Sequence, residues 1–140
     1  MVKKLFFNEQ IMAIYQNLFN KVFKSQDIKE ASEQAPAILY LVYENENIVG
    51  FVSGYPTNKI TFYIQYAGML KEYRGHKTLS FFMEATNKIH GDFQRINCMI
   101  KNNNIAAIKI ALTSKFIING IKQDKLKNLF VELTREVCHG

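Results

Sequence analysis

The sequence predicts a single domain, residues 1–140, of mixed α/β class with α+β character, in which about four helices flank a mostly antiparallel sheet. Stretches with the apolar periodicity of helices alternate with short runs rich in β-branched and aromatic residues. The stretch Ile60–Ile89 joins both kinds, as a strand-like run, a short basic turn and an amphipathic helix. Another strand-like run follows, so we expect one β-α-β unit at the centre of the sheet.

Apolar spacing predicts a first helix over Asn8–Phe23, with Asn8 as its N-cap. A second, short helix is expected over Ser25–Gln34, because a serine can cap it and a proline follows soon after its end. Two apolar runs then predict strands over Ile38–Glu44 and Ile48–Tyr55, which the polar turn between them joins as a hairpin.

The central unit begins with a strand over Ile60–Met69, which follows the turn signal Pro56-Thr57-Asn58. The helix after it is expected to run to about His90, where a Gly-Asp pair ends it. The spacing i, i+3, i+4, i+7 places these residues on its apolar face: Leu79, Phe82, Met83, Thr86 and Ile89.

The C-terminal part predicts a strand over Arg95–Ile100 and then a helix that Asn104 or a neighbour caps. One face of that helix is expected to hold Ile105, Ile108, Ala111 and Leu112. The runs Phe116–Lys122 and Leu129–Arg135 predict a closing pair of strands.

The composition is that of a folded protein, with 48% hydrophobic and 21% charged residues. The apolar runs are too short to span a bilayer, and polar residues interrupt the N-terminal stretch before a secretory signal develops. Cys98 and Cys138 form no CxxC motif, and the three histidines are too far apart for a metal motif. We therefore expect a cytoplasmic protein that holds no metal and does not enter a membrane.

The net charge of +6 is scattered along the chain and does not form one basic stripe. Such an excess suits an anionic ligand. The strands lack the basic–aromatic alternation of RNA-binding sheets, which argues against nucleic acid as the partner.

The turn between the central strand and its helix reads Arg74-Gly75-His76-Lys77-Thr78. A strand that enters a helix through such a turn directs backbone N–H groups and the positive end of the helix dipole at one point. That point favours a phosphate or pyrophosphate. Arg74 can bind this anion or lie in solvent as an ordinary turn residue, and both interpretations stay open here.

The sequence around this turn resembles the GNAT-type N-acetyltransferase superfamily. The segment 67–75, AGMLKEYRG, is similar to the strand end and cofactor-loop entry of that family. The segment 104–110, NIAAIKI, is similar to its second signature, and Phe116 stands where the family has the Phe of a Gly-Phe pair. The order of elements matches over nearly the whole chain.

The resemblance implies that acetyl-CoA binds in a cleft where the family's fourth and fifth strands splay apart. It also implies direct attack on the thioester by a primary amine, from a small molecule or a protein, and it leaves a homodimer open. Met69 and Leu70 would bond the pantetheine arm through their backbones. Asn104 would touch that arm or order the end of the fifth strand, and it can also simply cap its helix. The pyrophosphate would be held by the loop and first helical turn: Arg74, Gly75, His76, Lys77, Thr78, Leu79 and Ser80.

The chain departs from the family pattern at several positions. Lys77 and Leu79 stand where the family uses small residues that let a phosphate approach the backbone, although Lys77 brings a charge of its own. Ala111 stands where many members carry a tyrosine that protonates the departing thiolate, and Lys115 replaces the glycine before Phe116. These departures leave open a non-catalytic GNAT-like module that binds an acyl-CoA or a protein.

The strand that supplies a glutamate base in some members has no carboxylate here. Tyr63 and Gln65 share a face by strict alternation and are the candidate catalytic residues, which could hold a water at the acceptor. They could equally be packing residues of the sheet. A tyrosine with an ordinary pKa of about 10 is a poor base at neutral pH.

Overall fold

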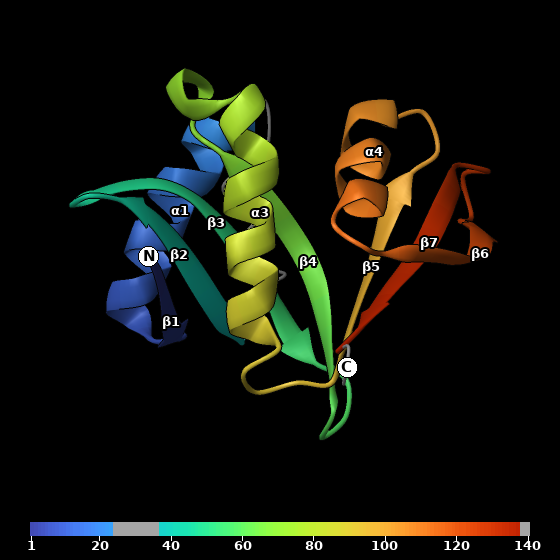
Figure 1. Cartoon of the computed structure of the whole chain (residues 1–140), viewed down its shortest axis with the longest axis horizontal. Coiled ribbons are helices and arrows are strands. Elements are labelled where there is room, and N and C mark those ends of the chain that lie inside the picture. The colour runs from blue at the N-terminus through green and yellow to red at the C-terminus, as the bar shows by residue number, and fades with distance from the viewer. Residues whose placement is uncertain (24–36, 138–140) are drawn as a thin grey trace.

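Seven strands form one sheet in the order β1-β2-β3-β4-β5-β7-β6, in a computed structural model that describes residues 1–23 and 37–137 (Figure 1). Every neighbouring pair is antiparallel except β4–β5, which is parallel. The strands are β1 Val2–Phe6, β2 Ile38–Glu44, β3 Asn47–Pro56, β4 Thr61–Met69, β5 Arg95–Lys101, β6 Ile117–Gln123 and β7 Leu129–Glu136. The helices are α1 Glu9–Phe23, α3 His76–Ile89 and α4 Ile105–Thr113, with a 3-10 turn over Lys71–Tyr73.

The predicted class, the antiparallel sheet and the central β-α-β unit are confirmed, with three α-helices among the described residues. The short helix expected over Ser25–Gln34 lies outside the described residues, as does Cys138. Strand β1 was not predicted, and it pairs along its whole length with β2. Asn8 caps α1 as expected, since its Oδ1 accepts the Ile11 N–H at 2.9 Å.

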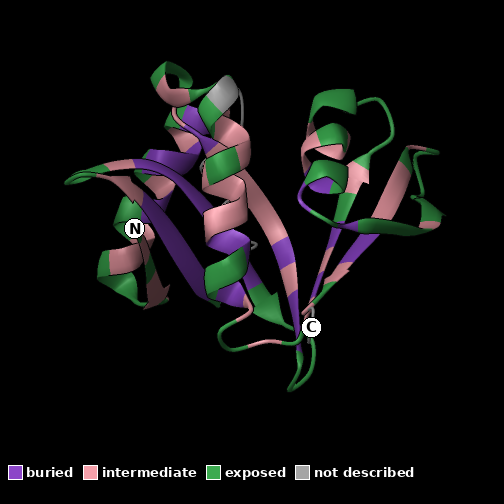
Figure 2. Cartoon of the chain, viewed as in Figure 1, coloured by how far each residue is buried: buried purple, intermediate pink, exposed green. Residues whose placement is uncertain are grey.

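The two faces of the sheet are covered by different helices, because alternate residues of β2 point to opposite sides. Ile38 and Tyr40 pack with the residues of α3, whereas Leu39 and Leu41 pack with Tyr15 and other residues of α1. Figure 2 shows the buried residues concentrated in this part of the sheet, under the two helices. None of the described helices has the length and apolar character needed to cross a membrane.

The predicted apolar face of α3 is partly wrong. Thr86 and Ile89 are buried as expected, together with the unpredicted Ala85. Leu79 and Met83 instead border a shallow surface depression that includes polar residues of the same helix. The buried stripe is therefore rotated from the predicted one toward Ala85.

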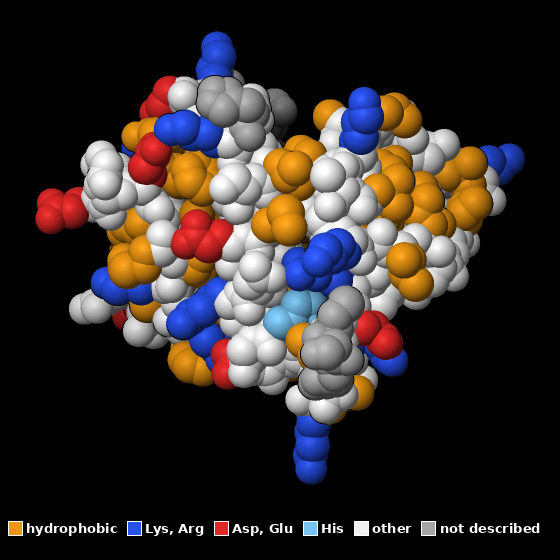
Figure 3. All heavy atoms as spheres, in the orientation of Figure 1, with side chains coloured by type: hydrophobic (Ala, Val, Ile, Leu, Met, Phe, Trp, Pro, Cys, Tyr) orange, Lys and Arg blue, Asp and Glu red, His pale blue; other side chains and the backbone are white. Residues whose placement is uncertain are grey.

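The predicted face of α4 is also partly wrong. Ala111 is buried, but the side chains of Ile105 and Leu112 are 64% and 44% exposed. Figure 3 shows hydrophobic side chains gathered on this side of the molecule, over α4, β6 and β7. The helix is short and apolar on nearly every side, so its sequence does not indicate which face is buried.

One extra residue in β4 alters the sheet at the point where β4 leaves β5. The register with β3 jumps from Gly54–Ile64 to Ser53–Tyr66, so β4 holds one residue more than β3 there, Gln65. The parallel pairing with β5 ends at the same place, with the pair Ile64–Cys98. Beyond this bulge the two strands diverge, as Figure 1 shows.

Gly54 is required beside this bulge, because a Cβ there would lie 1.9 Å from the carbonyl oxygen of Tyr63. We expect Gly54→Ala to lower the free energy of unfolding by about 3 kcal/mol, since backbone must move to admit the methyl group. Urea unfolding would measure the change. Gly91→Ala is the matched control, with a Cβ 3.1 Å from the Lys88 carbonyl oxygen, and should have a much smaller effect. A Gly54→Ala protein as stable as the wild type would contradict the role assigned to Gly54.

Lys115 adopts a left-handed conformation, with φ of 72°, just after α4 ends. This is the position where the family resemblance places glycine, and the geometry supplies the reason. We expect Lys115→Gly to raise the free energy of unfolding by about 1 kcal/mol, because glycine has no Cβ penalty there. Lys109→Gly, on the exposed side of α4, should lower it by about 1 kcal/mol. Equal effects of the two substitutions in urea unfolding would contradict this assignment.

Candidate functional site

A cleft of about 820 Å³ opens where β4 and β5 diverge. Its walls are residues 64–69 of β4, residues 98–101 of β5, the start of α3 and one side of α4, with the end of α1 at its edge. Most of the lining side chains are apolar, and the polar groups gather near the start of α3 and at Asn104. The volume and the mostly apolar lining are those of a site for a small molecule or cofactor.

Helix α3 begins at the edge of this cleft. Its N-cap, Gly75, has φ of 115°, which favours glycine, and the Gly75 N–H donates to Thr78 Oγ1 at 3.1 Å. Both residues line the cleft, and a Cβ added to Gly75 would meet no atom within 4 Å. The Thr78 N–H donates to the carbonyl oxygen of Gly75 at 3.1 Å. The start of α3, with the positive end of its dipole, therefore lies at the cleft.

Arg74 also lines the cleft, and its exposed side chain is anchored by hydrogen bonds to the backbone. Its Nε donates to the carbonyl oxygen of Met69 at 3.0 Å, and one Nη donates to the carbonyl oxygen of Val22 at 2.8 Å. The guanidinium thus joins the end of β4 to the end of α1. A guanidinium has five N–H groups, so others remain for an anion.

Some of the loop residues that follow line the cleft, and the others lie outside it. Lys77 does not line the cleft, and its Nζ forms an ion pair with Glu44 Oε1 at 2.7 Å. Leu79 and Ser80 lie on the shallow depression of α3. The described cleft residues of the predicted cofactor set are Met69, Arg74, Gly75, Thr78 and Asn104. Leu70 is absent from the lining, and its N–H is bonded to Val49; the side chain of His76 is not described.

Asn104 caps α4, since its Oδ1 accepts the Ala107 N–H at 3.2 Å, and it lines the cleft at the same time. Ala111, on the same helix, is 1% exposed and contributes only a methyl group to the lining. The helix therefore offers an amide at its start and no proton donor at Ala111.

The two candidate catalytic residues are separated by the bulge. Gln65 lines the cleft, whereas Tyr63 does not, because the extra residue interrupts the alternation that placed them on one face. The ring of Tyr63 packs on Tyr55 at 5.4 Å between centroids. Burial raises the pKa of Tyr63 to about 12, so its phenol stays protonated at neutral pH.

Other cleft residues were not predicted. Val22 and Phe23 reach it from the end of α1, where Gly68 of β4 allows close packing: a Cβ there would lie 2.3 Å from Val22 Cγ1. Cys98 also lines the cleft, and burial raises the pKa of its thiol to about 12. Within residues 1–23 and 37–137, no group of three or more His, Cys, Asp or Glu side chains could hold a metal ion.

The anchoring of Arg74 predicts a structural effect of removing it. Arg74→Ala should lower the free energy of unfolding by about 1 kcal/mol, because two backbone carbonyl groups lose their donors. Arg95→Ala is the matched control, since Arg95 bonds the exposed side chain of Glu136 and should contribute about 0.5 kcal/mol or less. Thermal or urea unfolding would test this, and an Arg74→Ala effect no larger than that of the control would contradict it.

No protein-family model matches the chain, and no curated protein matches it by sequence. Solved structures match it over nearly the whole length. They include a Bacillus subtilis acetyltransferase in complex with CoA, at TM-score 0.72 and 15% identity over 99% of this chain and 100% of that one. A GNAT family acetyltransferase from Elizabethkingia anophelis with acetyl-CoA bound matches at TM-score 0.68 and 15% identity, over 97% and 98%.

The ribosomal-protein-S18-alanine N-acetyltransferase of Escherichia coli matches at TM-score 0.69 with 9% identity, over 100% of this chain and 96% of that one. At such low sequence identities, these matches show that the chains share the same backbone fold. It includes the divergence of β4 from β5, which the resemblance in the sequence implied. The chain therefore has the fold of the GNAT acetyltransferases.

Proposed function

We propose that the protein is an N-acetyltransferase that takes its acetyl group from acetyl-CoA and transfers it to a primary amine. The observation that carries this proposal is the cleft between β4 and β5, with the N-terminus of α3 at its edge. The solved acetyltransferases that share this fold support it, and they include one with CoA and one with acetyl-CoA bound.

The residues present fit such a donor. The first turn of α3 and the remaining N–H groups of Arg74 suit a pyrophosphate, and Gly75 leaves the approach open. The apolar stretch between β4 and α4, with Ala107 and Ile110, suits the pantetheine arm. When bound, acetyl-CoA supplies the activated acyl group.

The side chains of the cleft favour direct transfer. Cys98 is the nucleophile of greatest intrinsic reactivity there, but the raised pKa keeps it a thiol at neutral pH, so an acyl-cysteine route is disfavoured. Direct transfer needs the amine held close to the thioester, and such positioning supplies a large part of the acceleration. No Asp, Glu or His is among the described residues that line the cleft.

A second candidate is a module that binds an acyl-CoA or a protein without catalysis. The buried methyl group of Ala111 favours it, because this position cannot protonate a leaving thiolate. The two candidates differ in turnover and agree in binding of the donor.

The proposal predicts micromolar binding of acetyl-CoA and of free CoA, measured by isothermal titration. Ala106→Glu should weaken both at least tenfold, because it places bulk and negative charge in the cleft wall at the first turn of α4. Ala13→Glu, on the exposed side of α1 and outside the cleft, is the matched control and should bind like the wild type.

The same preparations should then acetylate amines from a broad panel, with release of CoA thiol as the measurement. Binding without turnover would favour the second candidate. Failure of both CoA species to bind at millimolar concentration would overturn the proposed function.

A further inference from the structure

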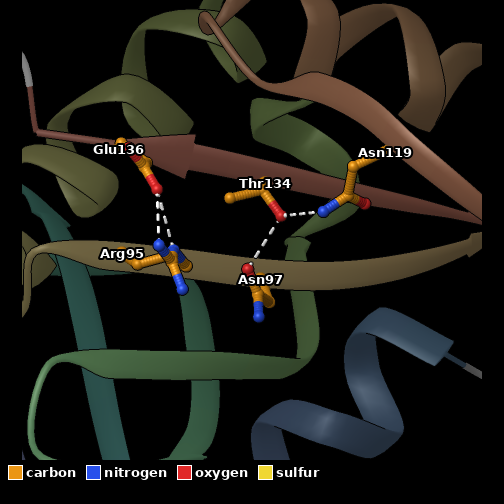
Figure 4. A network of polar contacts seen from close by, with 5 residues as sticks. All are labelled: Arg95, Asn97, Asn119, Thr134 and Glu136. Carbon is orange, nitrogen blue, oxygen red and sulfur yellow. Dashed lines mark hydrogen bonds and ion pairs between the residues drawn. The ribbon is translucent and has the colours of Figure 1, made fainter.

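The face of the sheet opposite α4 carries a polar network across three strands. The Nδ2 of Asn119 donates to Thr134 Oγ1 at 2.7 Å, and Thr134 Oγ1 donates to Asn97 Oδ1 at 2.9 Å. Figure 4 shows these side chains meeting across β6, β7 and β5, with the Arg95–Glu136 ion pair beside them. The register fixes the shared face, since Asn97 pairs with Thr134 and Arg95 with Glu136.

One step along the same face lies Glu132, opposite Met99 of β5 and Gly120 of β6. Met99 lines the cleft, and Glu132 lies directly opposite it on the neighbouring strand β7. A Cβ on Gly120 would lie 2.8 Å from Glu132 Oε2, so the glycine leaves room for the carboxylate.

Glu132 is half-buried, and its carboxylate has no hydrogen bond or ion pair with any residue of the described chain. The other glutamate of this face, Glu136, is held by Arg95. Lys101 and Lys122 lie one row further on, opposite Phe130. They do not form an ion pair with Glu132 among the described residues.

Two tyrosine rings, from β3 and β4, lie on the same face of the sheet as this carboxylate. Tyr63 pairs with Asn97 in the parallel ladder, so its ring shares the face, and Tyr55 packs on it. Burial is the main cause of the raised pKa of the Tyr63 phenol, and the charge of Glu132 adds to it. A carboxylate beside aromatic rings attracts a cation, by ion pairing and by cation–π interaction.

We propose that Glu132 binds the ammonium group of the acceptor amine, with Tyr63 and Tyr55 beside it, on the face of the sheet next to the cleft. The proposal rests on the proposed function, in which the donor fills the cleft and the acceptor reaches it from a neighbouring surface. It assigns to β7 the carboxylate that β4 lacks. The acceptor site then selects a cationic amine over a neutral or anionic molecule of the same length.

The test uses the methyl group of Met99 as a reporter, because Met99 is paired with Glu132 on the adjacent strand. The protein is labelled with ¹³C-methyl methionine, and Met99→Leu assigns the signal among the five methionines. Butylamine, butanol and butyrate are titrated at pH 7, with and without CoA. We expect butylamine to shift the Met99 signal with millimolar affinity and the other two to leave it unchanged at the same concentrations.

Glu132→Gln should weaken butylamine binding at least tenfold, whereas Glu136→Gln, the same change on the same face, should preserve it. A Glu132→Gln protein that binds butylamine like the wild type would overturn the proposal. So would equal shifts from butanol, or no shift of the wild-type signal by butylamine. Titration of each variant with CoA separates this result from the proposed function, since Glu132→Gln should leave CoA affinity unchanged.

Discussion

The structure depends on one constraint in β4, the extra residue at Gln65. Backbone hydrogen bonding holds β4 against β3 on one edge, so an additional residue must either break that ladder or bend the strand. The strand bends, Gly54 makes room for it, and pairing with β5 ends at Ile64, the residue before the bulge. The opening of the cleft between β4 and β5 follows from this one extra residue, as does the separation of Tyr63 from Gln65.

The connection between the cleft and the rest of the molecule runs through Arg74. Its side chain binds carbonyl groups of Met69 and Val22, so the turn before α3 is fixed to both the sheet and the first helix. Lys77 is held in a similar way by Glu44 of the β2–β3 hairpin. The basic turn in the sequence therefore stabilises the fold at the edge of the cleft, and binding of an anion by Arg74 stays a prediction.

Local chemistry made much of this fold predictable. The strand Ile38–Glu44 and the cap at Asn8 were predicted correctly, because apolar runs and N-caps act through neighbouring residues. Strand β1 was missed because two lysines in five residues hide its alternation. The shared face of Tyr63 and Gln65 was expected from period-two alternation, which holds only in an unbroken strand. The role of Val22 in the cleft depends on tertiary packing, for which the sequence around it carries no signal.

The short parallel ladder between β4 and β5 has a mechanical consequence. Four residue pairs, Thr61–Ile64 with Arg95–Cys98, are the hydrogen-bonded seam between the two halves of the sheet. The seam joins the halves at one end, so side-chain contacts such as the packing of Phe82 on Phe116 hold them together beyond it. A ligand that contacts both β4 and β5 would link the two strands where they are not paired. With the ligand bound, the two halves of the sheet would therefore unfold more cooperatively than in the free protein.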